Sequence, residues 1–269
     1  MLSSAVFISR IWWSLNSVSE IELSGDAKIR TLLKDSNTFG LMFNNNNNNH
    51  IVWMNGHTLT IVAGGTFPFR NVTTVGDGTI VGIPTEEVST GKKSLSFYGA
   101  PSDISSVTLD IHDGCGLNIE QPVKVGTFID RRTIFRNDGT KGHNGTSNDR
   151  DSDAGMLTAL NRFKPMAGNL LKTITLGDAD HANPVLDLSA LDDTFTIPES
   201  GFAMNYAAGA TIGVDLEGRR ISGTKKRLVA WNAIPEADFF RIDGEQSLQL
   251  IKKEDGLYHP GIGFRFILK

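Results

Sequence analysis

The sequence predicts an all-β protein, a right-handed parallel β-helix or solenoid with one short inserted helix. The first observation is a set of short β-branched runs, such as 59–62 and 79–81, separated by Gly-Gly and Gly-Asp-Gly corners. Strands this short cannot bury a hairpin face alone, and their fairly even spacing is typical of stacked coils or a larger β-sheet. The second observation is composition: the chain has 28 glycines, and only 21% of its residues are charged. This balance fits many tight corners between strands.

The totals exclude some classes of function. With 269 residues, of which 39% are hydrophobic, the chain can form a core. The net charge is −4, and the basic pairs and triplets at 131–132 and 225–227 are isolated. Nucleic-acid binding needs a clustered basic face, so we expect no nucleic-acid partner.

We expect four segments along the chain. They are a ragged N-terminal segment (1–20), β-solenoid coils (21–136), a polar loop with a short helix (137–168), and further β coils with a C-terminal cap (169–269). A small β-sandwich-like C-terminal end is the alternative for the last segment. The apolar N-terminal stretch lacks a basic start, contains Arg10, and is too short to span a bilayer. It leaves two explanations, a cytosolic protein or the C-terminal part of a longer exported chain, and we favour the second.

Period-two alternation justifies the strands of the first half. Asn55-Gly56 is a strong turn signal after the run 51–54, and six asparagines at 44–49 favour a polar loop over an asparagine ladder. Strands are expected at 94–98, 107–111, 116–119 and 124–129. The inward positions are expected to be Leu95, Phe97, Val107, Leu109, Ile111, Leu117 and Ile119.

The expected helix covers residues 154–163. Ser152 or Asp153 can cap it, an apolar stripe runs through Met156, Leu157, Leu160 and Phe163, and Pro165 ends it. After it, strands are expected at 171–176, 185–188, 194–197, 211–216, 227–231, 239–242, 248–251 and 263–268. Turn residues stand between these runs, as at Asp243-Gly244.

Several of these segments resemble a known class of protein. The run 55–82 (Asn-Gly-His-Thr-Leu-Thr-Ile, then Gly-Asp-Gly-Thr-Ile-Val) resembles the repeats of autotransporter-like bacterial surface proteins, the autotransporter-associated β-strand repeats. The segments 186–189, 209–218, 228–231 and 255–258 resemble the C-terminal portion of such proteins. The resemblance implies a right-handed parallel β-helix at a cell surface, with no catalytic set to transfer.

Two groups of residues are candidates for chemistry. Asp110, His112 and Asp113 combine acids with a histidine, as do Asp178 and His181, and β-helix lyases and hydrolases use paired acids along one face. Asp103 could share the face of Asp110 and Asp113. Aspartate is nevertheless the default turn residue, so the weight of this argument lies with a structural role.

The metal candidates are Asp149, Asp151 and Asp153, which alternate as at the start of a calcium loop. Ala154 and Leu160 stand where that loop needs Gly and a bidentate acid, so we favour a solvated acidic loop. The scattered histidines predict no zinc site, and no cofactor is expected. Cys115, the single cysteine, is expected to be structural.

Three functions are consistent with this pattern. The first, which we favour, is a non-catalytic bacterial surface or secreted β-solenoid with a structural or adhesive role. The second is a β-helix carbohydrate-active enzyme using the Asp110 and Asp113 neighbourhood. The third is a glycan-binding attachment module, whose stacking aromatics would come from Trp12, Trp13, Trp53, Tyr98, Tyr206, Trp231 and Tyr258. Most of these lie inside apolar strand runs, where core packing is the commoner role, and only Trp12 and Trp13 are expected to be exposed. Glycans are therefore the expected partners.

Overall fold

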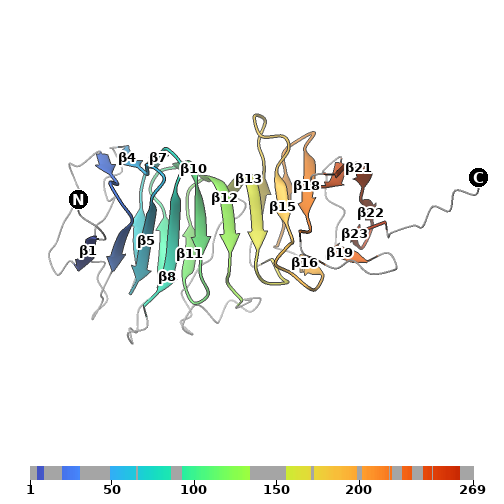
Figure 1. Ribbon diagram of the computed structural model, residues 1–269, viewed down its shortest axis with the longest axis horizontal. Coiled ribbons are helices and arrows are strands. Elements are labelled where there is room, and N and C mark those ends of the chain that lie inside the picture. Colours follow the sequence, from blue (N-terminus) through green and yellow to red (C-terminus); the bar gives the residue numbers. More distant parts are fainter. Residues whose placement is uncertain are drawn as a thin grey trace, which may run out of the picture.

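The computed structural model is an elongated all-β molecule whose strands cross its long axis and follow one another from the N-terminus to the C-terminus (Figure 1). The structure describes residues 5–8, 20–30, 49–64, 66–85, 93–133, 156–170, 173–198, 202–217, 219, 226–231, 239–243 and 245–260. Within these ranges every regular element is a strand, and most strand pairs are parallel. This confirms the all-β prediction.

A 16-stranded sheet contains two long parallel ladders. The longer of the two, called the second ladder below, runs through aligned strands in chain order. Its members are β1 (Ala5–Ile8), β3 (Ala27–Arg30), β5 (Thr58–Ala63), β8 (Thr79–Pro84), the C-terminal half of β10 (Ser102–Ile111), the C-terminal half of β12 (Val123–Asp130), the C-terminal half of β13 (Leu157–Pro165), β15 (Val185–Asp187), β18 (Thr211–Asp215) and β20 (Phe239–Ile242).

The first ladder precedes the second within each pass of the chain. It comprises β2 (Glu20–Glu22), β4 (His50–Trp53), β7 (Val72–Val75), the N-terminal halves of β10, β12 and β13, then β14 (Ile174–Leu176) and β17 (Met204–Tyr206). Register shifts between Ile104 and Thr108, and again in β12, divide the long strands between the two ladders. These irregularities form the corner at which the chain changes direction.

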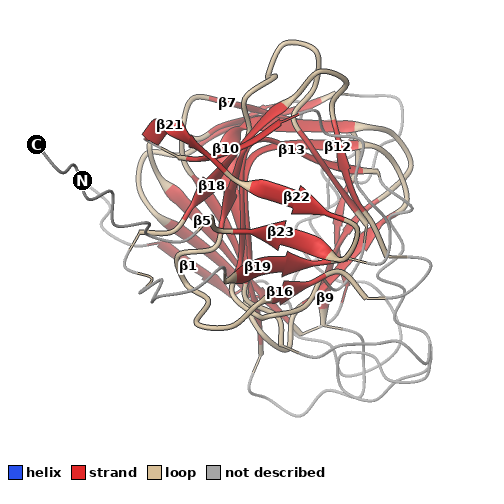
Figure 2. Cartoon of the chain, turned by 90° about the vertical axis from the view of Figure 1, so that its right-hand side faces the viewer, coloured by secondary structure: helices blue, strands red, loops and turns tan. Residues whose placement is uncertain are grey.

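A third sheet of β6 (Thr66–Phe69), β9 (Ser94–Phe97) and β11 (Gly116–Ile119) is also parallel. The chain therefore repeats one circuit: β4, β5 and β6 are followed by β7, β8 and β9, and then by β10 and β11. Viewed along the long axis, the strands surround a central region (Figure 2). We use the word circuit below for one such pass across the first ladder, the second ladder and the third sheet.

The C-terminal strands change to antiparallel pairing. The hairpin strand β21 (Glu245–Gln249) pairs with β20, and a terminal sheet has the order β16 (Phe195–Thr196), β19 (Arg227–Ala230), β23 (Gly256–Tyr258) and β22 (Ile251–Lys253). In that sheet only β16 and β19 are parallel. The parallel stacking thus gives way to antiparallel strands at this end of the described chain.

The core is a continuous column of stacked apolar side chains. On the second ladder, the register places one apolar residue of each strand directly above that of the next strand. The residues of this column are less than 5% exposed, except Ile242 at 8%. This column contains Leu59, Ile80, Leu109, Phe128, Phe163, Leu186, Val214 and Ile242. The rings of Phe128 and Phe163 stack with centroids 5.6 Å apart. Every inward position predicted for the first half is buried.

Local turn chemistry follows the sequence. Asn55 and Gly56 both have positive φ, 51° and 77°, as the Asn-Gly signal predicts. The turn joins β4 on the first ladder to β5 on the second. Gly82 occupies an inward position where a Cβ would lie 2.6 Å from Leu95 Cδ1 and 2.9 Å from Ile111 Cδ1, so a larger residue there must displace the ends of these two side chains.

The predicted helix at 154–163 is wrong. Leu157–Pro165 is the strand β13, which pairs with β12 on one side and with β14 and β15 on the other. A register shift places Ala159 opposite Val125 and Arg162 opposite Thr127, so β13 has one extra residue at the corner. Burial then falls on Leu157, on both Ala159 and Leu160, and on Phe163, a spacing that imitates a helical stripe.

Other predicted features lie outside the described residues. They are the asparagines 44–48, the N-terminal tryptophans 12 and 13, the polar loop from 137 with its acidic end at 149–153, and the strand expected at 263–268. Because β13 is part of the main sheet, the described end of the predicted insertion (137–168) belongs to the β coils.

Candidate functional site

The predicted acidic site at Asp110 joins two successive circuits. Asp110 lies on β10 in the second ladder and is 8% exposed, while Arg131 follows the neighbouring strand β12. The guanidinium donates through Nε to Oδ1 at 2.7 Å and through Nη2 to Oδ2 at 3.0 Å. This hydrogen-bonded pairing raises the pKa of Arg131. His112 Nε2 is 3.7 Å from Asp110 Oδ1, so the structure does bring this predicted pair together.

Asp113 has a different partner. Its Oδ1 accepts from the backbone N–H of Thr133 at 3.0 Å, and its Oδ2 accepts from the Thr133 hydroxyl at 2.9 Å. Asp103 is aligned with Thr73 and Lys124 on neighbouring strands of the first ladder. The register shift of β10 separates it from Asp110, which lies on the second ladder. The expectation that Asp103 shares a face with Asp110 and Asp113 is therefore wrong.

A buried ion pair lies next to this region. Arg132 is 4% exposed and donates to Asp130 through Nε at 2.7 Å and Nη2 at 2.8 Å. Both side chains line a cavity of 20 Å³ together with Thr173 and apolar core residues. That volume suits one water molecule and is far below that of a substrate pocket.

The second predicted acid–histidine group forms a turn. Asp178 Oδ1 accepts from the backbone N–H groups of Asp180 and His181 at 3.1 Å and contacts His181 Nδ1 at 2.8 Å. Lys124, from an earlier circuit, donates to Asp178 Oδ2 at 2.9 Å. The hydrogen bonds from Lys124 and then His181 hold the pKa of Asp178 well below its usual range. This arrangement is an Asx-turn that also ties two circuits together.

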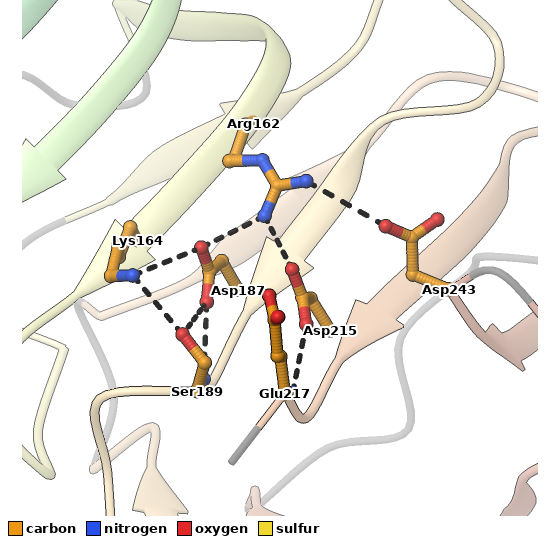
Figure 3. A network of polar contacts seen from close by, with 7 residues as sticks. All are labelled: Arg162, Lys164, Asp187, Ser189, Asp215, Glu217 and Asp243. Carbon is orange, nitrogen blue, oxygen red and sulfur yellow. Dashed lines mark hydrogen bonds and ion pairs between the residues drawn. The ribbon is translucent and has the colours of Figure 1, made fainter.

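The largest polar cluster was not predicted from the sequence (Figure 3). Arg162, on β13, reaches across the outer face of the second ladder. Its Nη1 donates to Asp187 Oδ2 at 2.8 Å and to Asp215 Oδ2 at 2.7 Å, and its Nη2 is 3.6 Å from Asp243 Oδ2. The guanidinium thus bridges carboxylates from three later circuits. We call Arg162, Lys164, Asp187, Ser189, Asp215 and Asp243 the arginine clamp.

Register explains why these carboxylates are close together. Asp187 pairs with Asp215, and Val214 pairs with Ile242, so Asp243 continues the same outward column just beyond β20. Gly213 leaves room for the Asp243 side chain, because a Cβ at residue 213 would lie 3.3 Å from both Asp243 Oδ1 and a Val185 methyl group.

Further donors complete the clamp. The Ser189 hydroxyl donates to Asp187 Oδ1 at 2.5 Å, and Lys164 Nζ lies 3.0 Å from Ser189 Oγ and 3.3 Å from Asp187 Oδ2. Burial pushes the pKa of Asp187 upward, but the hydrogen bonds from Ser189 and Arg162 outweigh burial, so this pKa is lowered. Burial likewise opposes the charge on Arg162, yet its bonds to Asp215 and Asp187 keep its pKa raised.

The clamp had one signal in the sequence. Asp187 and Asp215 each end a strand, Asp243 directly follows one, and the three recur at equal sequence intervals. A repeat of one acid at one strand position indicates a stacked column if the register is known. Chemically, a column of carboxylates tied to a guanidinium is a means of joining circuits.

Within the described ranges there is no group of three or more His, Cys, Asp or Glu side chains that could hold an ion. The candidates Asp149, Asp151 and Asp153 lie outside those ranges. Cys115 is buried in the core, with Sγ 3.7 Å from the carbonyl oxygen of Gly116.

The candidate stacking aromatics have different environments. Trp231 is 5% exposed and donates through Nε1 to the Lys253 carbonyl, which fits a core role. The Arg70 guanidinium lies over the Tyr98 ring at 3.9 Å. Trp53, by contrast, is 37% exposed and points outward from the first ladder.

Comparison of the chain with protein-family models, with curated proteins and with solved structures finds no match. In the part of the chain that the structure describes, no helix has the length and apolar character needed to cross a membrane.

Proposed function

We propose that the repeated circuits form a right-handed parallel β-helix and that this solenoid has a non-catalytic, structural or adhesive role. Three parallel ladders visited in the same order, with one continuous core, support the architecture. The handedness follows from the strong preference of parallel crossover connections for the right hand. A solenoid presents long, regular outer surfaces, which suits a stalk or an adhesive segment.

The observation that carries this proposal is the use of polar side chains between circuits. Asp110 pairs with Arg131, Asp113 with Thr133, and Asp178 with Lys124, and in each case the partners come from different circuits. The arginine clamp does the same over four circuits, from Arg162 on β13 to Asp243 after β20. The acids that were candidates for sugar chemistry thus hold neighbouring coils together.

We also propose a location. The resemblance of the segment 55–82 to autotransporter-like repeats, and of 186–189 and 209–218 to the C-terminal portion of such proteins, supports a place at a bacterial cell surface or in a secreted protein, as part of a longer exported chain. Glycans of that environment are the partners that fit an adhesive role.

The test compares the wild type with Asp110→Asn on a panel of neutral and acidic polysaccharides. Product formation and glycan retention are measured together. We expect no cleavage by either protein, with retention on at least one glycan. Cleavage by the wild type that Asp110→Asn abolishes would show a carbohydrate-active enzyme and overturn the proposal.

A further inference from the structure

We propose that the exposed indole of Trp53 is the stacking platform of a binding subsite for a neutral pyranose. The inference rests on the proposed adhesive role and names its ligand class and contact residue. Trp53 is the last residue of β4, and its burial pattern places it on the outer face of the first ladder, away from the core. It is 37% exposed, whereas the inward neighbours Val52 and Met54 are at most 1% exposed.

The surroundings of Trp53 combine apolar and hydrogen-bonding groups. Register places Val75 on one side of it and Glu22 on the other, and Ile51 shares its face two residues earlier. Neighbouring strands lie about 4.8 Å apart, so these side chains border the indole directly. A sugar ring needs such a mixture, because its C–H face is apolar and its edge carries hydroxyl groups.

The polar groups beside the indole are held in place. Asn55 Nδ2 donates to the Leu23 carbonyl at 3.0 Å and to Glu22 Oε1 at 3.3 Å. The positive φ of Asn55 fixes the turn that carries it. Both N–H groups of the Asn55 amide are engaged in these bonds, so Asn55 Oδ1 and the Glu22 carboxylate serve as acceptors for sugar hydroxyl groups, with little loss of side-chain entropy.

Charge selects among sugars. The exposed acids Glu20 and Glu22 lie on β2, and they are aligned with Ile51 and Trp53 respectively. An anionic glycan placed on the indole would face these carboxylates, and like charges repel. The favoured ligand is therefore an uncharged pyranose chain, and a uronic-acid chain is disfavoured.

The experiment uses the full chain and measures binding of cellohexaose, xylohexaose, chitohexaose and a galacturonic-acid hexamer by calorimetry and by tryptophan fluorescence. The variants are Trp53→Ala, Trp53→Phe and, as a matched control, Met156→Ala, because Met156 is also 37% exposed. Far-UV circular dichroism checks that each variant keeps its strand content.

We expect at least one neutral hexamer to bind, with Trp53→Ala weakening its affinity about tenfold. Trp53→Phe should keep part of the affinity and lose the fluorescence change, and Met156→Ala should match the wild type. Absence of binding by all neutral hexamers, or preference for the galacturonic-acid hexamer, would overturn the inference.

Two outcomes separate this inference from the proposed function. Equal binding by the wild type and Trp53→Ala would overturn the Trp53 subsite and leave glycan adhesion standing. Cleavage of a bound hexamer would overturn the non-catalytic role, while the ratio of affinities between wild type and Trp53→Ala would still decide the subsite.

Discussion

Replacement of Arg162 by methionine tests the arginine clamp. Methionine keeps the apolar stem of the side chain and removes the charge and the donors. In the wild type the guanidinium makes two short bonds, to Asp187 and Asp215, whose side chains are 5% and 18% exposed. After replacement these carboxylates and that of Asp243 face one another in adjacent strands, with Lys164 as the remaining cation of the clamp.

The magnitude follows from those contacts. Hydrogen bonds to charged groups contribute about 1.5–3 kcal/mol each, which gives an upper bound for the two bonds. The Arg162 side chain is 33% exposed, so solvent screening reduces that figure. We expect Arg162→Met to lower the free energy of unfolding by roughly 2–4 kcal/mol at pH 7.

The assay is urea unfolding followed by far-UV circular dichroism, with Arg227→Met as the control. Arg227 pairs with Asp255 at 3.3 Å, but their side chains are 42% and 57% exposed, so its loss should be far smaller. Equal unfolding midpoints for the two variants, or a more stable Arg162→Met, would refute the reasoning.

The pH dependence gives a second readout. The pKa of Asp187 in the folded protein is lowered, so the stability that the clamp contributes is full above the unfolded pKa of about 3.9. That contribution is lost as the pH falls through the lower folded pKa. The difference between the wild type and Arg162→Met should therefore shrink below about pH 4.

Three further changes test other contacts. Gly82→Val should destabilise the protein by about 1–3 kcal/mol in urea unfolding, because the new side chain overpacks the core; unchanged stability would contradict this packing. Arg132→Met should cost about 3–5 kcal/mol by leaving the buried Asp130 carboxylate without the guanidinium, and Asp130→Leu added to it should restore most of the loss. A double variant as unstable as Arg132→Met alone would show that the Asp130 carboxylate left without the guanidinium is not the cause of the loss. Lys124→Met should raise the pKa of Asp178 toward its usual range in a carboxyl NMR titration, and an unchanged pKa would exclude the pairing.

The strands and their inward faces were predictable from local pattern. Alternation alone identified Gly116–Ile119 with its observed bounds, and it placed Leu95 and Phe97 inside. Two-residue periodicity needs no knowledge of the partner strand, because each side chain's face is fixed by its own strand.

The corners were not predictable in the same way. In β13 an extra residue between Ala159 and Arg162 breaks the alternation and produces apolar spacings of three, which a helix also shows. A bulge is defined relative to the strand it pairs with, so one chain segment alone cannot distinguish the two structures.

The candidate site was predicted in part. Asp110 and His112 were grouped as candidates because they are close in sequence, whereas the pairing of Asp110 with Arg131 depends on the register of β10 with β12. The arginine clamp depends on the register of four successive strands, which the equal spacing of its aspartates indicates but does not fix.

The most direct test of the central claim, parallel in-register stacking of successive circuits, is a cysteine cross-link between strands. Thr79 and Thr108 are aligned outward neighbours on β8 and β10, so cysteines there, in a Cys115→Ala background, should form a disulfide on oxidation. Cysteines at Thr79 and Thr127 lie two strands apart, about 10 Å, and should not. Mass spectrometry should show the cross-link in the first pair alone, and a cross-link in the second pair alone, or in neither pair, would contradict the stacking.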